Sequence, residues 1–587
     1  MTAASPEVPS KNVKWIVQKY GGTSIGKFLP TIVDSITPSY LKTNRVVIVC
    51  SARSGQTKAL GTTNLLLQAC NEAMRSIQGN NTLDSSRSSL SSSFQADSMG
   101  PLSSIQMGLS RTEFVPEFQA TVEKIKEDHF EAARESVQNT QLREQLEQDI
   151  ADDCMCLNQF LQAAMILHEV SPRSRDVIMG MGERLACRLV VAALIDRGIQ
   201  AELVTLESIV DELDVEIMRP SSLAYEASNY LEQSFYDRLS TVLAERILKC
   251  EGVPVVTGYF GNVPGSLLSQ VGRGYTDLCA ALCAVGLKAN ELQIWKEVDG
   301  VFTADPRKVP TARLVPAITP EEAAELTYYG SEVIHPFTME QAIKKSVPIR
   351  IKNVDNPTGC GTVIFPDHIT PSVDDDIKHD PFLDGHVEQP EPPLSGISTP
   401  VHRSQKNVRK MPTAVTIKDN ILVLNVHSNR KTISHGFFAG IFGTLNRYGV
   451  VVDLISTSEV HVSMAMTAEL RPRTLERLSA ELEHIGTVSI LRNMVILSLV
   501  GKEMRQMVGV AGSMFSTLAE GNVNIEMISQ GANEINISCV IHEKSALKVC
   551  MTCINNAQAL NLIHYSILEG SPKPCNMEGG TFGRSFF

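Results

Sequence analysis

Apolar segments of strand length alternate with helical stretches between residues 13 and 365. The apolar segments are Val13–Tyr20, Arg45–Ala52, Val253–Thr257 and Glu291–Val298. In the helical stretch Gly180–Gly198, the residues Leu185, Leu189 and Ala193 recur at i, i+4 and i+8 and therefore share one helix face. Such alternation is typical of a layered α/β domain with a mainly parallel sheet. We therefore predict one α/β domain over residues 13–365.

Two polar stretches interrupt this pattern. Between Ser76 and Ser110, Ser, Asn, Gly and Gln are frequent and large apolar residues are few, which predicts an exposed insertion. Between Pro366 and Lys410, three consecutive aspartates and repeated prolines predict a linker. We also expect residues 1–12 to form a flexible N-terminus.

Past the linker, the chain contains an internal repeat. Thr444–Ser456 and Thr517–Ser529 align without a gap. Each copy lies between two strand patterns, which are Ala414–Val426 and Val460–Met466 for the first copy and Met494–Val500 and Glu534–Val540 for the second. This arrangement predicts a duplicated β-α-β unit, with one domain over residues 411–488 and a second, including a C-terminal tail, over residues 489–587.

Composition and charge narrow the class of protein. The chain has 587 residues, of which 43% are hydrophobic and 20% charged, as in soluble globular proteins, and its apolar runs are too short to span a membrane. The net charge of −12 favours a small-molecule partner over nucleic acid. The opening residues lack the pattern of a secretory or mitochondrial signal, and the 13 cysteines stand mostly in apolar contexts. We therefore expect a cytoplasmic protein with reduced thiols.

A pair of glycines follows the first predicted strand, at Gly21 and Gly22 in the run Lys19–Ser24. Glycines let a backbone approach an anion, a helix start offers free N–H groups, and Lys19 supplies a positive charge. The spacing is not that of a P-loop, and a glycine pair after a strand is also common in tight turns. The residues by themselves leave both a phosphate site and a simple turn open.

Three further motifs follow along the chain. In Gly180–Ala186, a glycine-rich turn would leave Glu183 in the first turn of a helix, either as a cap or as a ligand of a substrate ammonium. In Gly272–Asp277, Thr276 or Asp277 would cap the next helix, while Arg273 would bind a carboxylate or phosphate or stand on the surface. Trp295–Arg307 is either a structured loop or part of a ligand site at the carboxyl end of a strand.

In this order, the four motifs resemble those of aspartate kinases in the amino acid kinase family, of the fungal-like monofunctional type. The family patterns K-[FY]-G-G-[ST]-S, G-E-[RL]-L, G-R-G-x-[ST]-D and D-G-[VI]-[YF]-[TS]-x-D-P-R are matched at Lys19–Ser24, Gly182–Leu185, Gly272–Asp277 and Asp299–Arg307. The similarity continues through Glu325–Pro336 and Val347–Asn353. The resemblance implies an amino acid kinase fold, with α/β/α layers, followed by two α+β ACT domains of βαββαβ order.

The resemblance also implies roles for individual residues. Lys19 and Asp277 would be catalytic, and the ATP site would comprise Lys19, Gly21, Gly22, Ser24, Ser51, Glu297, Phe302 and Arg307. The aspartate site would comprise Thr63, Glu183, Arg273 and Thr276. The chain departs from many relatives at Lys296 and Glu297, where they have Thr-Asp, and at Glu332, where they have lysine, so the adenine-side contacts match the family least well.

The activity that the resemblance implies is phosphorylation of the side-chain carboxylate of L-aspartate by ATP, with Mg²⁺ held mainly through the phosphates. The product is 4-phospho-L-aspartate, the first intermediate on the way to threonine and methionine or homoserine, and in some organisms lysine. An aspartate side chain is already an anion near neutral pH and needs no general base. What the site must do is bring it to a polyanionic phosphate, for which Lys19 and backbone N–H groups are suited.

ACT domains imply a homo-oligomer and feedback control by an amino acid, with threonine as the first candidate and lysine as the second. The sequence offers an Ala- and Gly-containing segment before each repeat helix, at Gly436–Phe442 and Val510–Phe515, as either an effector loop or only a helix start. The effector site implied by the resemblance comprises Gly436, Phe437, Ala439, Ile441, Asp453, Ile455, Ala511, Met514 and Glu526.

Two alternatives stay open from the sequence. The first is another kinase of the same fold, acting on glutamate, acetylglutamate or a nucleoside monophosphate. The second is a catalytically silent regulator that binds amino acids, although Lys19, Arg273 and Asp277 are all present. No metal site made by the protein alone is expected.

Overall fold

The computed structural model describes residues 14–55, 61–87, 116–213, 231–263, 274–330, 334–366, 411–428, 436–546 and 559–569. The chain divides into two compact units, Met1–Asp299 with Phe337–Val387 and Gly300–Pro336 with Glu388–Phe587. Residues 300–336, which fall within the predicted α/β domain, thus group with the C-terminal part of the chain. The predicted linker and the first twelve residues lie outside the described residues.

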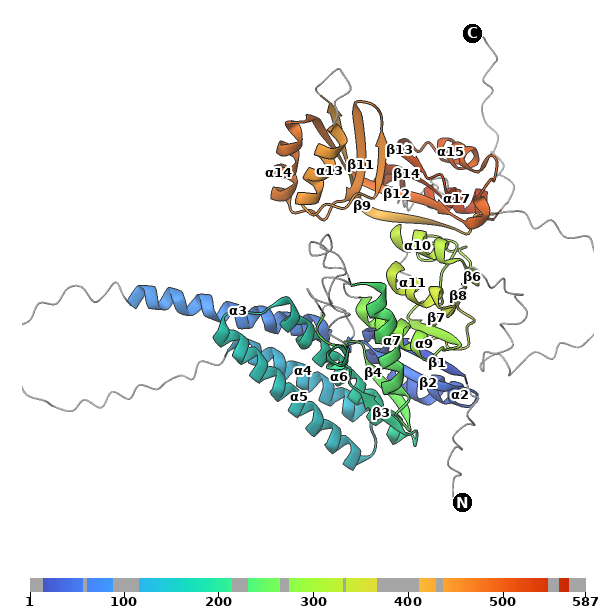
Figure 1. The fold of residues 1–587 in the computed structure, drawn as a ribbon. Coiled ribbons are helices and arrows are strands. Elements are labelled where there is room, and N and C mark those ends of the chain that lie inside the picture. The colour runs from blue at the N-terminus through green and yellow to red at the C-terminus, as the bar shows by residue number, and fades with distance from the viewer. Residues whose placement is uncertain are drawn as a thin grey trace, which may run out of the picture. The chain divides into compact units, whose positions relative to one another are not determined.

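The first unit is built on a mainly parallel sheet (Figure 1). Its strands are β1 (Trp15–Tyr20), β2 (Arg45–Cys50), β3 (Ala201–Val204), β4 (Val253–Thr257), β5 (Glu291–Lys296), β7 (Ile349–Asn353) and β8 (Thr362–Ile364). They lie in the order β3-β4-β2-β1-β5-β7-β8, and the neighbours are parallel except for β7 and β8. The four strands predicted from the apolar segments are all present, and the predicted α/β class is confirmed.

Helices α6 (Pro172–Asp196) and α9 (Tyr275–Gly286) cover the two faces of this sheet. The other helices of the unit are α1 (Gly22–Thr31), α2 (Thr37–Leu41), α3 (Thr62–Arg87), α4 (Glu117–Ser136), α5 (Thr140–Leu167), α7 (Gln233–Ile247) and α11 (Pro336–Lys344). Ile16 and Ile48 join one apolar cluster with residues of α6, whereas the alternate strand residues Val17 and Val47 are buried outside that cluster. Because side chains alternate along a strand, α6 and α9 pack on opposite faces.

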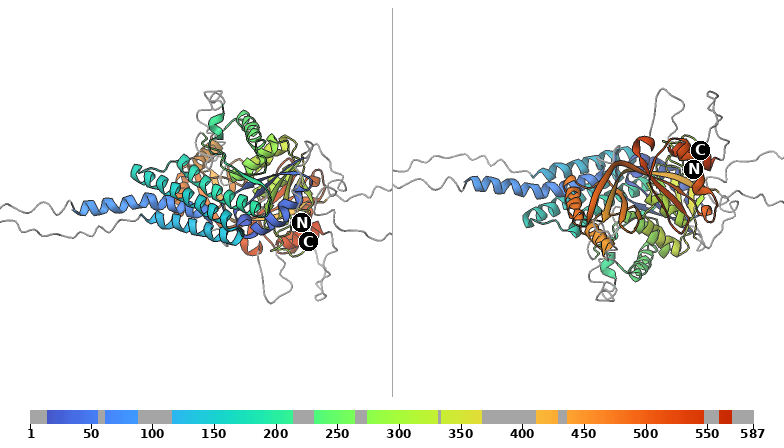
Figure 2. Two further views of the ribbon diagram at one scale, coloured as in Figure 1. Left: turned by 90° about the horizontal axis from the view of Figure 1, so that it is seen from below. Right: turned by 90° about the horizontal axis from the view of Figure 1, so that it is seen from above.

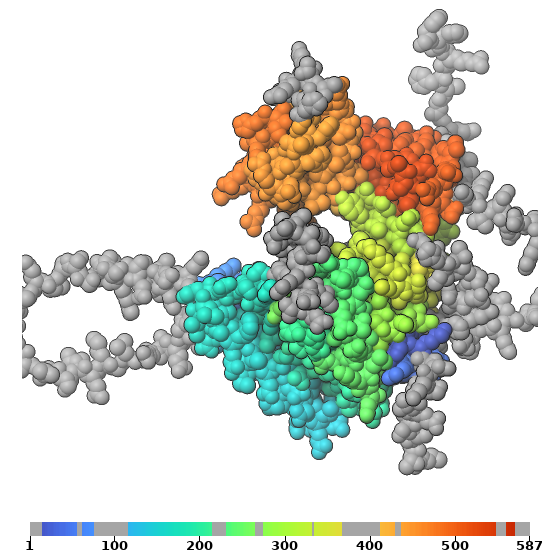
Figure 3. Space-filling view, viewed as in Figure 1, coloured from blue at the N-terminus to red at the C-terminus, as the bar shows by residue number. Residues whose placement is uncertain are grey.

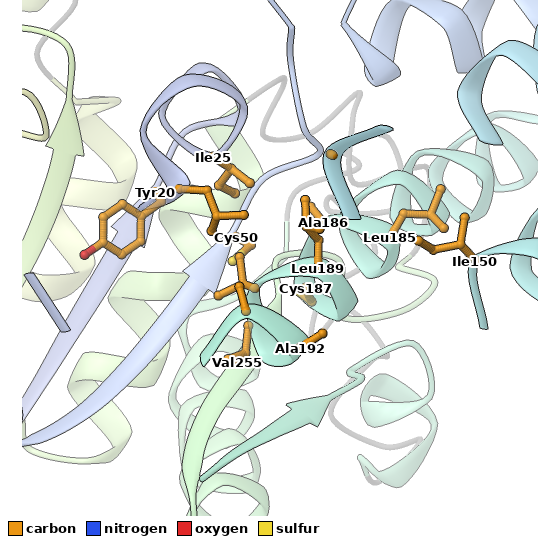
Figure 4. Close-up of a cluster of buried hydrophobic side chains, with 14 of the residues drawn as sticks. Tyr20, Ile25, Cys50, Ile150, Leu185, Ala186, Cys187, Leu189, Ala192 and Val255 are labelled. Carbon is orange, nitrogen blue, oxygen red and sulfur yellow. The ribbon is translucent and has the colours of Figure 1, made fainter. Parts of the chain in front are cut away.

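Helices α3, α4 and α5 run side by side and extend away from the sheet (Figure 2). In the space-filling view, α4 and α5 form a packed lobe on one side of this unit (Figure 3). Figure 4 shows Leu185 of α6 beside Ile150 of α5, while Cys187 of the same helix lies toward Cys50 of β2. Helix α6 therefore joins the sheet to the helical lobe.

The first part of the insertion predicted over Ser76–Ser110 is helical. Helix α3 continues from its apolar start at Leu65 and Leu66 as far as Arg87, so the polar composition does not end the helix. Once a helix has nucleated, each added residue gains one backbone hydrogen bond at little further cost, which outweighs weak local preference. Residues 88–110 of the predicted insertion lie outside the described residues.

The second unit contains the internal repeat. The first copy comprises β9 (Ala414–Ser428), α13 (Phe437–Arg447), β10 (Leu454–Thr457), β11 (His461–Thr467) and α14 (Pro472–Glu483). The second comprises β12 (Gly486–Val500), α15 (Val510–Glu520), β13 (Ile525–Gln530), β14 (Asn536–His542), α16 (Glu543–Ala546) and α17 (Ala559–Ile563). The same order of strands and helices in both copies confirms the predicted duplication.

One antiparallel sheet joins the two copies in the order β10-β11-β9-β12-β14-β13. The long strands β9 and β12 pair at its centre, with a register irregularity between Leu491 and Ile496. Each long strand thus serves both copies, because its two halves lie on either side of this irregularity. The unit also contains β6 (Ala317–Ile318) and α10 (Pro320–Tyr328) from the 300–336 segment. No helix in the described ranges is both long and apolar enough to cross a bilayer.

Candidate active site

A cavity of about 300 Å³ lies at the carboxyl ends of β1 and β2, where α1, α3 and α9 begin. Its lining residues are Gly22, Thr23, Ser51, Ala52, Ser54, Gly61, Thr63, Asn64, Met179, Glu183, Tyr275 and Thr276. Ligands collect at this end of parallel strands, and helix N-termini favour anions. Five predicted residues meet here although they are far apart in the chain, namely Gly22, Ser51, Thr63, Glu183 and Thr276.

The glycine pair has two separate roles. Gly21 is the extended N-cap of α1, which begins at Gly22, so the motif is a helix start and the tight-turn alternative is wrong. A Cβ atom on Gly22 would overlap the carbonyl oxygen of Ala52, and the Gly22 carbonyl accepts a hydrogen bond from the N–H of Ser54 at 2.9 Å. A Cβ on Gly21 would meet only the Ser24 hydroxyl, at 3.9 Å. Gly22 is therefore required by packing, while the face of Gly21 is open.

Lys19, the next-to-last residue of β1, forms an ion pair with Asp277 in the first turn of α9. Its Nζ lies 2.7 Å from Asp277 Oδ1, and the two side chains are only 12% and 16% exposed. The predicted capping roles of Asp277 and Thr276 are wrong, because α9 begins after Gly274 without a side-chain cap. The side chains of Thr276 and Asp277 instead contact Glu183 of α6 and Lys19 of β1. The ion pair with Asp277 holds the Lys19 ammonium, which belongs to the strand directly before α1.

A second carboxylate anchors α1 from the neighbouring strand. The hydroxyl of Ser24, which is fully buried, donates to Glu297 Oε1 at 2.8 Å. Glu297 directly follows β5, which pairs with β1 in parallel. The departure from the family pattern at this position thus supplies a hydrogen-bond partner for the glycine-rich segment.

Glu183 lies within α6 and not after a turn, so the predicted glycine-rich turn is corrected. Gly180 and Gly182 are helical, and each faces a neighbour that leaves no room for a side chain. A Cβ on Gly180 would lie 2.5 Å from the Tyr259 ring, and one on Gly182 would lie 2.8 Å from the Leu66 side chain. The glycines allow close helix packing, and the helix-cap alternative for Glu183 is wrong because it stands in the middle of the helix.

The carboxylate of Glu183 is buried, yet it lines the cavity. It accepts a hydrogen bond from the N–H of Tyr259 and one from the hydroxyl of Thr276, both at 2.7 Å. Burial raises the pKa of Glu183 to about 7, against the lowering effect of these hydrogen bonds and of further ones from the Tyr275 hydroxyl and the Gly258 N–H. Such a carboxylate is suited to bind a buried ammonium, which would supply the missing positive charge.

Three of the other predicted residues are not placed at this cavity by the described structure. Arg273 falls outside the described residues. Phe302 and Arg307 belong to the second unit, where Phe302 forms an isolated bridge with Leu314 and the exposed Arg307 pairs with Asp305 at 2.9 Å. Their roles stay predictions, as do those of the residues that line the cavity.

The predicted effector residues are distributed over both repeats. The segments Phe437–Phe442 and Val510–Phe515 are the first turns of α13 and α15, and each follows a glycine with positive φ, so neither is a loop. Ile441 and Met514 are fully buried, Phe437 is nearly so, and Gly436, Ala439, Ile455 and Glu526 are exposed, while Ala511 is half-buried. Asp453 is paired with Lys418 at 2.6 Å. Because the side chains of Ile441 and Met514 are buried, an effector at these positions would contact their backbone atoms.

Sequence reasoning missed several cavity residues, including Thr23, Ser54, Asn64, Met179 and Tyr275. Thr23 and Tyr275 belong to the motifs Lys19–Ser24 and Gly272–Asp277, and Asn64 is next to the predicted Thr63. This closeness in sequence to predicted site residues is the signal that could have identified them. Met179 carries the same signal, because it directly precedes the Gly180–Ala186 motif. Ser54 stands in no motif, and only the fold brings the segment after β2 to α6.

Comparison with known proteins gives one consistent picture. The profile of the amino acid kinase family matches residues 14–353, and that of the ACT domain matches residues 497–555. Aspartokinase of Schizosaccharomyces pombe is 49% identical over 562 residues, covering 96% of this chain and 94% of the relative. Aspartokinase of Saccharomyces cerevisiae is 45% identical, covering 93% of each chain.

Solved structures agree at the level of the fold. The structure of Escherichia coli aspartokinase III in complex with aspartate and ADP has a TM-score of 0.61 and 22% identity, covering 94% of this chain and 100% of that one. A second structure of the same enzyme, with lysine and aspartate, gives a TM-score of 0.61 and 23% identity, covering 94% of this chain and 99% of that one.

Proposed function

We infer that this chain, which belongs to the amino acid kinase family, is an ATP-dependent aspartate kinase that converts L-aspartate to 4-phospho-L-aspartate. The observation that carries the inference is one cavity lined both by the start of α1 and by the buried carboxylate of Glu183. The Lys19–Asp277 ion pair lies on the elements next to this lining, since Lys19 is three residues before α1 and Asp277 directly follows the lining residue Thr276.

The phosphates would bind at the start of α1. The N–H groups of its first turn have no partners within the helix, and the open face of Gly21 leaves room for a ligand. Lys19 would neutralise phosphate charge, and Asp277 holds its ammonium in place. Ser51, after β2, would extend this side of the site.

Aspartate would bind with its ammonium on Glu183 and Thr276, which the 2.7 Å hydrogen bond already holds together. Thr63, in the first turn of α3, would contact a substrate carboxylate, and Arg273 would pair with the α-carboxylate. The free side-chain carboxylate would then be the nucleophile. Because it is ionised near neutral pH, no general base is required, and catalysis consists of positioning and charge neutralisation.

The Mg²⁺ that the family implies would be held mainly through the phosphates. Among the described residues there is no cluster of three or more His, Cys, Asp or Glu arranged to hold a metal ion. Asp277 and Glu297 supply carboxylates, the ligand type that Mg²⁺ prefers, next to the two ends of the Lys19–Ser24 segment. When bound, the ion would neutralise phosphate charge during transfer.

A hydroxylamine trap tests this function directly. The parent with aspartate and Mg-ATP should form aspartyl hydroxamate, and Lys19→Ala should lower turnover by about a hundredfold or more, because charge stabilisation in the transition state is lost. Lys27→Ala removes an exposed lysine from α1, the helix that follows β1, and should leave turnover near the parent value. A silent amino-acid-binding regulator would give no hydroxamate with any variant.

Feedback control by an amino acid is part of the same proposal. Threonine is the first candidate and lysine the second, bound in the duplicated ACT region, which would also join copies of the chain into a homo-oligomer. The E. coli relative is described in complex with lysine, which supports an amino acid as the effector class. Inhibition assays with threonine and lysine, together with light scattering, test these points. Equal turnover with and without both amino acids would contradict the regulatory part alone.

The product defines the place of the reaction in metabolism. An acyl phosphate of aspartate is a substrate for reduction to the aldehyde, and the route proposed onward leads to threonine and methionine or homoserine. Kinases acting on glutamate or acetylglutamate share the fold, so the same assay with those substrates is the discriminating control.

A further inference from the structure

Tyr275 is the first residue of α9 and occupies the variable position of the Gly-Arg-Gly-x-Thr-Asp motif. It lines the cavity together with Glu183 of α6, and its side chain acts on that carboxyl as a hydrogen-bond donor that lowers the pKa of Glu183. The residue is 7% exposed. It therefore lies in the wall of the same cavity as the proposed ammonium ligand.

Each oxygen of Glu183 already has a partner from another element. Oε1 accepts from the Thr276 hydroxyl and Oε2 from the Tyr259 N–H, both at 2.7 Å. A Cβ on Gly258 would lie 2.6 Å from Thr276 Cγ2, so glycine is needed there for the Thr276 side chain to fit. The surroundings of Glu183 thus consist of hydrogen-bond donors held closely in place, and Tyr275 adds one from the cavity wall.

We propose that the hydroxyl of Tyr275 is a positioning group of the ammonium subsite, which keeps the Glu183 carboxylate ionised and oriented toward the cavity before aspartate binds. The inference rests on the proposed function, since it takes Glu183 as the ligand of the substrate ammonium. Tyr275 acts through Glu183 and is assigned no part in the transfer itself.

The charge balance at Glu183 explains why one donor matters. Burial alone favours the neutral acid, and the pKa stays at about 7 only because several donors stabilise the charged form. Loss of one such donor raises the pKa further, so that at pH 7 most of the carboxyl is neutral and attracts an ammonium weakly. Burial and the nearby Glu183 raise the pKa of Tyr275 well above its usual value, so its hydroxyl remains a donor at physiological pH.

Other titratable groups face this pair from each neighbouring element. Cys187 of α6 and Cys279 of α9 face Glu183, and the pKa of each thiol lies well above its usual value through burial and thiol contacts. Asp176 of α6 and Tyr259 after β4 face Tyr275. Burial raises the pKa of Tyr259 as well. A Glu183→Gln variant therefore serves to assign any acid limb to Glu183 rather than to Asp176.

The test compares Tyr275→Phe with the parent in the full-length protein. We expect the KM for aspartate at pH 7 to rise about tenfold, the loss typical of a hydrogen bond to a charged group, with the KM for ATP unchanged. The acid limb of kcat/KM for aspartate should move upward by about one pH unit, and the limb should be absent in Glu183→Gln. Tyr236→Phe, which removes a buried tyrosine hydroxyl from α7, is the matched control and should leave both quantities at parent values.

The possible results separate the two claims. If the parent forms acyl phosphate and Tyr275→Phe keeps the parent acid limb and KM for aspartate, the inference is overturned while the proposed function stands. A parallel rise in both KM values with a lower Tm would also overturn it, because that result describes general loosening of the fold. If the parent forms no acyl phosphate from aspartate, the proposed function itself fails. In case Tyr275→Phe is unstable, Tyr275→Leu provides the second test, because it also removes the hydroxyl. The pH dependence of aspartate binding should then move upward relative to the parent, and parent behaviour would overturn the inference.

Discussion

At the scale of single residues, the chemistry depends on groups that the fold has removed from water. Lys19 and Asp277 form an ion pair between β1 and α9, whereas among the described residues the hydrogen-bond donors to Glu183 are neutral groups. An ion pair in a partly buried site holds both charges, but a buried lone carboxylate is destabilised unless a ligand brings the opposite charge. This arrangement supports the proposal that Glu183 binds an ammonium supplied by the substrate.

The pH dependence of stability should reveal this residue. The pKa of Glu183 is about 7 when folded and 4.5 in its ordinary state, so its contribution to stability is complete below about pH 4.5 and is lost as pH rises through 7. The difference corresponds to an effect on the order of 3 kcal/mol. The Tm of Glu183→Gln relative to the parent should therefore increase between about pH 5 and pH 8. A Tm difference that stays constant or falls over this range would show that Glu183 is not held at a raised pKa.

The two glycines before α1 should respond differently to alanine. Gly22→Ala places a methyl group on the Ala52 carbonyl oxygen and should destabilise the fold by a few kcal/mol, since the obstacle is backbone. Gly21→Ala has room and an extended backbone, so the Tm should change little while the KM for ATP rises. Thermal melts and ATP titrations of both variants check this. Equal Tm losses would contradict the separate roles.

At the scale of elements, α6 carries the site and is held from its outer side. Asp153 of α5 contacts both Arg184 and Arg188, at 3.0 and 2.7 Å, and Asp149 contacts Arg188 at 2.8 Å. Arg184 directly follows Glu183, so these contacts limit rotation of the helix that carries the carboxylate. They also offset the low helix propensity of Gly180 and Gly182.

Removing the shared carboxylate should loosen this helix. Asp153 is 9% exposed and serves two arginines, so Asp153→Asn should lower stability by about 3 kcal/mol, as expected for breaking a buried ion pair. Asp149 is 34% exposed and forms an ion pair with Arg188, so Asp149→Asn is the control with a smaller expected loss. Urea unfolding of both variants measures the difference. A larger loss for Asp149→Asn would rule out this account of α6.

Much of this architecture could be predicted from the sequence, because strands and their alternation with helices depend on local apolar patterns. Val253–Thr257 was predicted to its observed limits. The glycines of α6 were misread as a turn, since their cause lies in Tyr259 and Leu66, which are distant in sequence. Similarly, local rules assigned Thr276 and Asp277 to capping, because their partners Glu183 and Lys19 become visible only when the elements are assembled.

At the scale of the whole molecule, the family match and the contacts within the structure assign the segment 300–336 to different parts of the chain. It lies inside the part of the chain that matches the kinase family, yet its contacts place it with the duplicated C-terminal region. Glu322 of α10 is one reason, since its Oε1 accepts from the Thr413 hydroxyl at 2.6 Å and from the Lys502 N–H at 2.7 Å. Both ends of the segment continue into the first unit, at Asp299 and at Phe337. The two units are therefore covalently connected at each end of the segment.

Loosening this anchor should affect the proposed feedback more than catalysis. Glu322→Ala removes the hydrogen-bond acceptor for Thr413 and Lys502. A change that effector binding causes in the repeats should then be transmitted less well to α10. We expect weaker inhibition by the effector amino acid with turnover in its absence within about twofold of the parent. Glu321→Ala, at the neighbouring position in the first turn of α10, is the control. Unchanged inhibition in Glu322→Ala would exclude this link.

The central claim is that the cavity brings the side-chain carboxylate of aspartate to the γ-phosphate of ATP. Phosphorus NMR of the purified chain with Mg-ATP and aspartate tests it most directly, because it observes the acyl phosphate itself. The account predicts an acyl phosphate signal that appears together with ADP when aspartate is present and is absent when glutamate or acetylglutamate replaces it. ADP formation without any acyl phosphate, or an acyl phosphate formed only from one of those other acids, would contradict it.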